Sequence, residues 1–197
     1  MMPAHFTGNI LHSKVVLLAA NPGYDEEEEK DFYHNPVFIK ERVEDLSFSN
    51  NYFLSENQER EKASPYWYKK LRWLIDAVNF EQVSKNIALL QHNPYHSSNY
   101  REIAKTYFKE VDFKNYIPSQ KFGFDILKYC IDNDKDIIIT RRKESWIKAV
   151  PELKEHELKG KVFTLINYQN PSVSPNNFTQ INGFQKIVQI LKQKTYE

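Results

Sequence analysis

The sequence of 197 residues contains a single cysteine, Cys130, and only five glycines. One thiol excludes an internal disulfide and any zinc or iron–sulfur site that needs several thiolates. The chain also lacks an apolar run long enough to cross a bilayer, and its first residues show no basic segment followed by an apolar one. We therefore expect a cytoplasmic protein without a membrane partner, a signal peptide or an iron–sulfur cluster.

The usual short signatures of catalysis and nucleotide binding are missing as well. Neither GxGxxG, GxxxxGKS/T nor GxSxG occurs. His92 and His96 have the spacing of a helical metal pair, but Pro94 lies between them and no carboxylate accompanies them. The acidic run 26–29 is more typical of a solvated loop than of a magnesium site. We expect no metal and no cofactor.

Length and composition predict one domain that spans residues 1–197, since 41% of the residues are hydrophobic. The net charge of +1 hides an asymmetry. Between Asp25 and Glu61 there are 12 acidic and 4 basic residues, and the rest of the chain holds 14 acidic and 23 basic residues. We interpret 25–62 as an acidic insertion. It is either an ordinary solvated loop or a surface that would face away from a bound polyanion.

Short apolar runs alternate with segments of helical periodicity. The runs 14–19, 86–90, 136–140 and 161–166 predict buried strands, and residues 1–13 are expected to be an irregular lead-in. Helices are predicted at 37–46, 65–78, 97–110, 118–133, 141–149 and 176–194. We expect Trp67 or Trp73 to face the sheet, and Phe122 to point inward. This alternation predicts an α/β protein, a three-layer αβα sandwich with a central four-stranded, mostly parallel sheet.

Three of the predicted strands are followed by the same dipeptide. Asn21-Pro22 follows the first strand, Asn93-Pro94 the second and Asn170-Pro171 the last. Each alone is compatible with an ordinary turn, because asparagine tolerates turn geometry and the residue before proline avoids the helical region. The carboxyl ends of parallel strands share one sheet edge, where open α/β proteins bind ligands. We therefore expect the three asparagines to share one site.

The motifs Asn21-Pro22-Gly23 and Asn170-Pro171-Ser172, with LLQHNPY at 89–95 between them, resemble the uracil-DNA glycosylase superfamily. The most similar part is its mismatch-specific uracil/thymine-DNA glycosylase branch, and the resemblance covers roughly residues 14–194. It implies a DNA-repair hydrolase that flips a deaminated or modified base out of DNA and removes it. The alternative is a catalytically inactive protein that binds a nucleobase or nucleic acid on the same fold.

The resemblance also implies roles for individual residues. Asn21 and Asn170 would be catalytic, with Asn21 accepting a hydrogen bond from the attacking water. The Asn93 amide would read the edge of the base, although the sequence does not say which base. Further candidates for base contacts are Tyr24, Phe32, His92 and His96, and candidates for phosphate or DNA contacts are Ser172, Ser174, Arg141, Arg142 and Lys143. An ordinary turn role for the histidines, core packing for the aromatic residues and a solvated helix start for the basic residues remain alternatives.

Several positions depart from the pattern of the superfamily. Ala19 occupies the place of a glycine, and Gly23 the place where uracil-specific enzymes carry a bulky side chain that shields against thymine. Asn170 stands where those enzymes carry a catalytic histidine. These departures fit either an altered substrate or a loss of catalysis. Strand preference and oligomeric state are left open by the sequence.

Overall fold

A computed structural model describes residues 3–23, 36–54, 65–97 and 115–193. The predicted helix at 97–110 lies outside these residues, apart from Ser97. In the described chain a five-stranded sheet has the order β1-β3-β2-β4-β5. The strands are β1 (Phe6–Thr7), β2 (Val15–Ala19), β3 (Ile87–Gln91), β4 (Asp136–Ile139) and β5 (Val162–Thr164).

The prediction of a mostly parallel sheet is confirmed, because β2 pairs in parallel with both β3 and β4, and β4 with β5. The predicted number of four strands is wrong. The supposed lead-in contains β1, which pairs antiparallel with β3 through Phe6 opposite Leu90. A strand of two residues is too short to show any alternation, so no sequence pattern identifies it.

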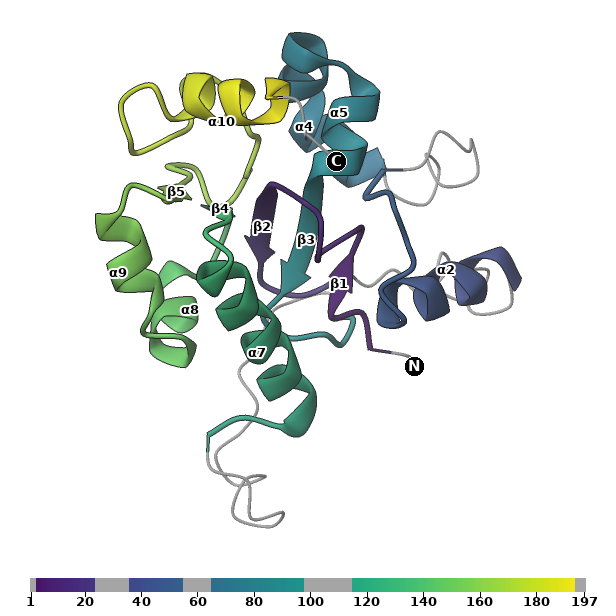
Figure 1. Cartoon of the computed structure of the whole chain (residues 1–197). Helices are drawn as coiled ribbons and strands as arrows, with labels where there is room; N and C mark the ends of the chain where they lie inside the picture. The colour runs from purple at the N-terminus through teal and green to yellow at the C-terminus, as the bar shows by residue number, and fades with distance from the viewer. Residues whose placement is uncertain (1–2, 24–35, 55–64, 98–114, 194–197) are drawn as a thin grey trace.

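Helices pack against both faces of the sheet. In Figure 1, α4 (Pro65–Val78), α5 (Phe80–Asn86) and α10 (Gly183–Lys192) gather on one side of the strands. On the other side lie α7 (Pro118–Asp132), α8 (Lys143–Ala149) and α9 (Leu153–Leu158). Along β2, Val15 and Leu17 pack toward the first group, and Val16 and Leu18 toward the second. A parallel strand buried on both faces explains the unbroken apolar run in the sequence.

Two short helices were not expected from the sequence. α5 begins after Asn79, whose side-chain oxygen accepts a hydrogen bond from the Gln82 backbone N–H at 2.9 Å and so caps the helix. α9 has only six residues. Both are too short for helical periodicity to stand out.

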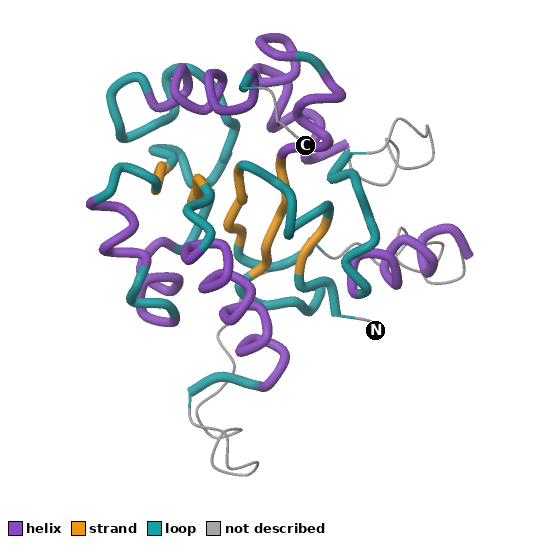
Figure 2. Tube along the Cα trace, viewed as in Figure 1, coloured by secondary structure: helices purple, strands orange, loops and turns teal. Residues whose placement is uncertain are grey.

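The C-terminal helix begins at Gly183 rather than at residue 176, and Figure 2 shows a long loop between β5 and this helix. The cause is Asn177, whose amide bridges the loop. Its Oδ1 accepts from the Asn167 backbone N–H at 2.8 Å, and its Nδ2 donates to the Ser172 carbonyl at 2.7 Å. These local bonds compete with helix formation.

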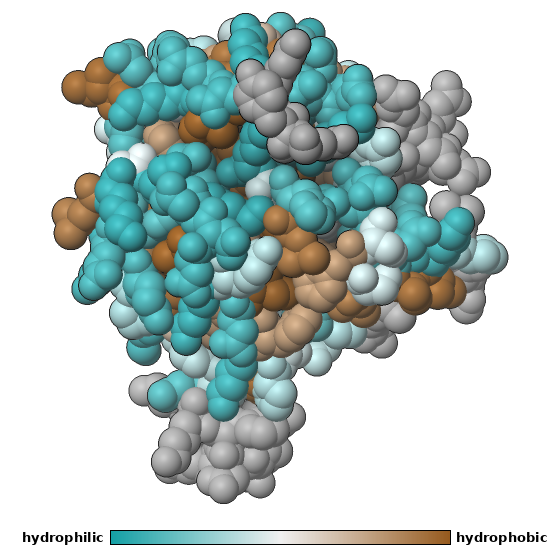
Figure 3. Space-filling model, viewed as in Figure 1, coloured by the Kyte–Doolittle hydropathy of each residue, from teal (hydrophilic) through white to brown (hydrophobic). Residues whose placement is uncertain are grey.

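Two predictions about individual side chains have clear outcomes. Trp67 packs against the core, while Trp73 on the same helix is 54% exposed. The expectation for Phe122 is wrong: it is 41% exposed, while Phe124, two residues later, is buried. The visible surface is mostly hydrophilic, with one apolar area near its centre and isolated apolar areas at its margin (Figure 3).

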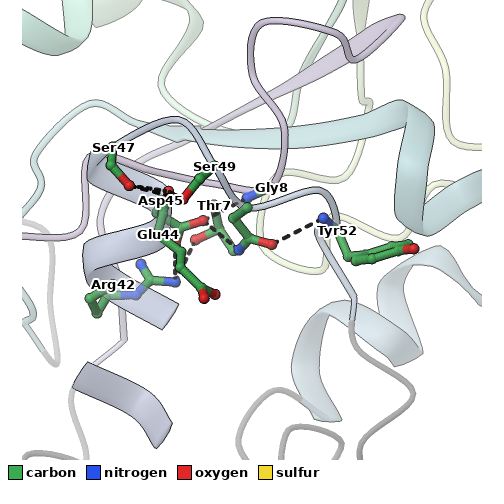
Figure 4. Close-up of polar contacts among 9 residues, drawn as sticks. Thr7, Gly8, Arg42, Glu44, Asp45, Ser47, Ser49 and Tyr52 are labelled. Carbon is green, nitrogen blue, oxygen red and sulfur yellow. Dashed lines mark hydrogen bonds and ion pairs between the residues drawn. The ribbon is translucent and has the colours of Figure 1, made fainter. Parts of the chain in front are cut away.

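α2 (Pro36–Leu46) carries a buried ion pair whose two side chains hydrogen-bond to the edge strand β1 and the turn after it (Figure 4). The Arg42 guanidinium lies 2.5 Å from Asp45, and it also donates to the Thr7 hydroxyl at 3.1 Å. Asp45 in turn accepts from the Gly8 backbone N–H at 3.1 Å. Gly8 has φ +89°, and a Cβ there would lie 2.9 Å from the Phe53 backbone, so this turn requires glycine.

Candidate functional site

The Asn21 and Asn93 turns lie side by side at the carboxyl ends of β2 and β3. The two strands pair in register with Ala19 opposite Gln91. The hydrogen bonding then continues past the strands, because the His92 N–H donates to the Ala19 carbonyl at 3.0 Å and the Asn93 N–H to the Ala20 carbonyl at 2.8 Å. The sheet pairing therefore brings together two of the three asparagines that the sequence singled out.

The Asn21 side chain is held by two hydrogen bonds. Its Nδ2 donates to the Pro22 carbonyl at 2.8 Å and to the Ser97 carbonyl at 2.9 Å. Both amide hydrogens are used, so the orientation of the amide is fixed and Oδ1 remains as an acceptor. Among the described residues no donor reaches this oxygen. It can accept a hydrogen bond from a water or ligand that enters the site.

The Asn93 amide has the opposite arrangement. Its Oδ1 accepts from the Tyr95 backbone N–H at 3.2 Å, which stabilises the turn. Among the described residues Nδ2 has no hydrogen-bond acceptor and remains available as a donor. The two neighbouring asparagines thus offer one acceptor and one donor.

His92 does not lie on the open side of this turn. Its side chain is buried, with ring centroids 5.0 Å from Trp146 and 5.2 Å from Phe124. Burial disfavours the charged imidazolium and lowers the pKa of His92 to about 4, and the positive charge of Arg142 acts in the same direction. A neutral, enclosed ring is typical of core packing, so the structure favours that role over base contact. His96 is half-buried.

The third turn lies beside α4 and the end of β4. Lys70 on α4 donates a hydrogen bond to Asn170 Oδ1, and the Lys70 carbonyl accepts from the Val173 N–H at 2.9 Å. Arg141, just after β4, donates to the Tyr66 hydroxyl at 3.2 Å and to the Gln169 carbonyl at 3.1 Å. Two elements far apart in the sequence therefore hold the loop that carries Asn170.

This second group lies at the same sheet edge as the first. Thr140 precedes Arg141, and both its N–H and its hydroxyl donate to the Leu18 carbonyl of β2, at 2.9 and 2.7 Å. In the sheet, β3 lies on one side of β2, and β4, the next strand along the chain, lies on the other side. α/β proteins commonly bind ligands outside the carboxyl ends of the strands where the strand order reverses in this way. Asn21 and Arg141 follow the two strands that flank this point.

The remaining predicted residues vary in position. Lys143 is paired with Glu157 at 2.6 Å, and Arg142, the N-cap residue before α8, has φ +61°. Ser172 and Ser174 are half-buried in the loop, where their carbonyls accept hydrogen bonds from Asn177. Tyr24 and Phe32 lie outside the described residues.

Sequence reasoning missed Tyr66 and Lys70. Both are one turn apart on α4, and the Lys70 ammonium lies 4.9 Å from the centre of the Tyr66 ring. An aromatic residue followed by a lysine four positions later occurs on many exposed helices, so the sequence carries no specific signal. Only the contact with the loop after β5 distinguishes them.

Burial, the positive charge of Arg141 and the nearby Lys69 all lower the pKa of Lys70. Burial also raises the pKa of the Tyr66 hydroxyl. The edge therefore combines neutral amides with closely spaced cations. Among the described residues, no carboxylate takes part in the hydrogen bonds of Asn21, Asn93, Lys70 or Arg141. The arrangement therefore suits the positioning of water and the binding of an anion rather than proton abstraction by a strong base.

Within the described ranges, no group of three or more metal-ligating side chains occurs, and none of the helices has the length and apolar character needed to span a bilayer. Comparisons of the chain with protein-family models, curated proteins and solved structures gave no match.

Proposed function

We propose that this chain is a DNA N-glycosylase-like protein that hydrolytically removes a deaminated or modified base, on a three-layer αβα scaffold of the uracil-DNA glycosylase type. The observation that carries the proposal is the pairing of the Asn21 and Asn93 turns at the carboxyl ends of β2 and β3. It supports a site in which one amide faces a water and its neighbour faces a base.

In the proposed reaction a base is first flipped out of the DNA into the site. Asn21 Oδ1 accepts a hydrogen bond from a water below C1′ of the flipped nucleotide. The water oxygen bonds to C1′, the C1′–N bond breaks, and its electron pair leaves with the base. The proton of the water passes to solvent, because an amide is too weak a base to hold it. Turnover is therefore expected to be slow.

A flipped base also has to be recognised. The Asn93 Nδ2 would donate to a carbonyl oxygen on the edge of the base, since Asn93 Oδ1 is used within the turn. A donor at this point favours a base with an exposed carbonyl, such as uracil, hypoxanthine or xanthine.

One observation favours the alternative of a binding protein without catalysis. Asn170 stands at the position of a catalytic histidine in related motifs, and its Oδ1 already accepts a hydrogen bond from Lys70. An amide N–H can donate a hydrogen bond, but it is too weakly acidic to transfer a proton to the leaving base. A binding protein would hold DNA without releasing a base.

The test is to incubate the protein with single-stranded and duplex oligonucleotides that contain uracil, hypoxanthine, xanthine or a modified cytosine, followed by alkaline cleavage of abasic sites. We expect product with at least one base, and a loss of roughly 100-fold or more in rate for Asn21→Ala.

Asn133→Ala is the matched control, since Asn133 caps the distal end of α7. Absence of product from every substrate, with an active glycosylase alongside, would refute the glycosylase proposal. DNA binding without product would then support the alternative.

A further inference from the structure

Two cations at the sheet edge are held in place by neutral oxygens. Arg141 donates to the Tyr66 hydroxyl and to the Gln169 carbonyl, and Lys70 donates to Asn170 Oδ1. Among the described residues neither Arg141 nor Lys70 has a carboxylate within ion-pair distance. Their neighbours differ in this respect, because Arg72 pairs with Asp76 at 3.9 Å and Lys143 with Glu157 at 2.6 Å.

The hydrogen bonds that fix these cations also orient further donors. The Tyr66 oxygen accepts from Arg141, so its own O–H is directed elsewhere. Because Asn170 Oδ1 accepts from Lys70, its Nδ2 faces the opposite way as a donor. The Arg141 Nε–H is buried and has no hydrogen-bond partner in the described part of the chain. Tyr66, Lys70, Arg141 and Asn170 are therefore neighbours that contact one another, carry further N–H and O–H donors and supply no negative charge.

Holding two cations together without a counter-charge is unfavourable. Burial and the charge of Arg141 both lower the pKa of Lys70, which reflects this cost. A bound anion would remove it. Phosphate suits the donor set, since arginine presents a planar fork of N–H groups and lysine a point charge, and both commonly bind phosphate oxygens.

We propose that Tyr66, Lys70, Arg141 and Asn170 form a phosphate-binding site that holds a backbone phosphate of DNA. The DNA assignment rests on the proposed function, whereas the phosphate site itself rests on the donor arrangement. The site lies at the end of β4, next to β2, and Asn21 follows β2. A phosphate held there would anchor the strand whose base enters the site formed by Asn21 and Asn93.

The experiment measures binding of a fluorescent oligonucleotide of about 15 nucleotides without any modified base, by anisotropy, between roughly 50 and 200 mM KCl. We expect Lys70→Met and Arg141→Gln each to weaken binding about tenfold and to lower the slope of log K against log salt by about one. Tyr66→Phe keeps the ring beneath Lys70 but removes the hydroxyl that positions Arg141. It should cause a smaller loss.

Two matched controls remove the same charges elsewhere. Arg72→Gln changes a 74% exposed arginine on the same helix, and Lys128→Met a lysine on α7. Both should bind within about twofold of the wild type. Circular dichroism and thermal unfolding check that each variant is folded. The phosphate site is overturned if the controls weaken binding as much as Lys70→Met and Arg141→Gln, or if folded Lys70→Met and Arg141→Gln proteins bind as the wild type does.

Two further measurements distinguish the phosphate site from the proposed catalysis and identify the source of the phosphate. The oligonucleotide carries no substrate base, so its binding can depend on Lys70 and Arg141 even if no base is ever released. Conversely, base release that is unchanged in Lys70→Met and Arg141→Gln would overturn the site and leave the glycosylase proposal standing.

Inorganic phosphate and a deoxynucleoside monophosphate are tested in a thermal-shift assay. Stabilisation by these alone, without oligonucleotide binding, would assign the site to a free nucleotide and overturn the DNA assignment.

Discussion

Asn21 is fixed by donating both amide hydrogens to backbone carbonyls, and this determines which substitutions it tolerates. An aspartate is a stronger base toward water, and on that ground alone a carboxylate at this position would favour hydrolysis. In this structure the new oxygen would instead face the Pro22 and Ser97 carbonyls, which accept hydrogen bonds at 2.8 and 2.9 Å and cannot donate them. The geometry selects asparagine over aspartate.

For Asn21→Asp we expect a loss of about 1–3 kcal/mol in the free energy of unfolding at pH 7. Two facing carbonyls favour the protonated form and raise the pKa of the introduced carboxyl above its value in the unfolded chain. The introduced carboxyl therefore binds a proton more tightly in the folded variant than in the unfolded one. The loss in the free energy of unfolding is complete above the folded pKa and becomes smaller as the pH falls below it. Urea unfolding at pH 7 and pH 4.5 measures this difference. Asn21→Ala is the control, and a deficit of equal size at both pH values for Asn21→Asp would contradict the expectation.

His92 makes the acid stability of the protein depend on a buried ring. Its pKa is about 4 in the folded chain, against 6.5 for an ordinary histidine. Between these pH values the unfolded chain binds the extra proton, so the free energy of unfolding falls as the pH is lowered from about 6.5 to about 4. The difference between the two pKa values corresponds to about 3 kcal/mol.

We therefore expect His92→Gln to be less stable than the wild type at pH 7 but to lose less stability between pH 6.5 and pH 4. Chemical denaturation across this pH range gives the slope. His5 is also buried and its pKa is also lowered by burial, so part of the slope should persist in the variant. His12→Gln, a change at an exposed histidine, should leave the slope as it is. An unchanged slope in His92→Gln would show that the ring is solvated in solution.

At the scale of the elements, the sequence predicts those strands that are buried along their whole length. The strands β2 to β5 lie within a few residues of the predicted runs, because a parallel strand covered on both faces must be apolar throughout. β1 and the start of α10 could not be predicted in the same way. β1 exists only because β3 offers an edge, and α10 starts late because Asn177 bonds to the preceding loop.

The same distinction applies to the site. Asn21 and Asn93 were predicted together because the register of parallel strands brings their turns to one edge. Tyr66 and Lys70 could not be predicted, since their role depends on how α4 packs against a loop that is about a hundred positions away. Local patterns report strands and helices, whereas contacts between distant side chains depend on tertiary packing.

The contact between α2 and β1 depends on Asp45, which is buried and accepts hydrogen bonds from the Gly8 N–H at 3.1 Å and the Asn50 amide at 2.7 Å. Asp45→Ala removes these two hydrogen bonds and the ion pair with Arg42. We expect a loss of about 2–4 kcal/mol in the free energy of unfolding, since the Gly8 N–H and the Asn50 amide lose a buried acceptor and each unmet buried donor costs about 1–3 kcal/mol.

Urea unfolding measures the effect of Asp45→Ala, and Glu44→Ala is the matched control on the same helix. Within the described part of the chain, the Glu44 carboxylate forms a surface pair with Lys40 at 3.7 Å, and its loss should cost less than about 1 kcal/mol. Similar losses for the two variants would show that the Arg42–Asp45 pair does not hold α2 to the sheet.

At the scale of the whole molecule, the distribution of charge along the sequence bears on the binding of a polyanion. The acidic run 26–29 begins only three residues after Gly23, while the cations that would hold phosphate lie at the end of β4 and on α4. Like charges repel over about a Debye length, which is about 10 Å at 0.1 M salt. An acidic segment so close in sequence to Asn21 should weaken the binding of DNA and restrict where the strand can lie.

Removing part of this charge tests that effect directly. We expect the double variant Glu26→Gln and Glu27→Gln to bind an oligonucleotide several-fold more tightly at about 50 mM salt, with the gain shrinking toward 200 mM as screening increases.

The matched control is Glu152→Gln with Glu155→Gln, which removes two exposed charges at α9. Because α9 leads into the amino end of β5, these charges lie toward the opposite edge of the sheet and their loss should change binding much less. Anisotropy titrations of both double variants over the same salt range make the comparison. Equal gains in the two would mean that only net charge matters, and that the acidic segment lies away from the path of the DNA.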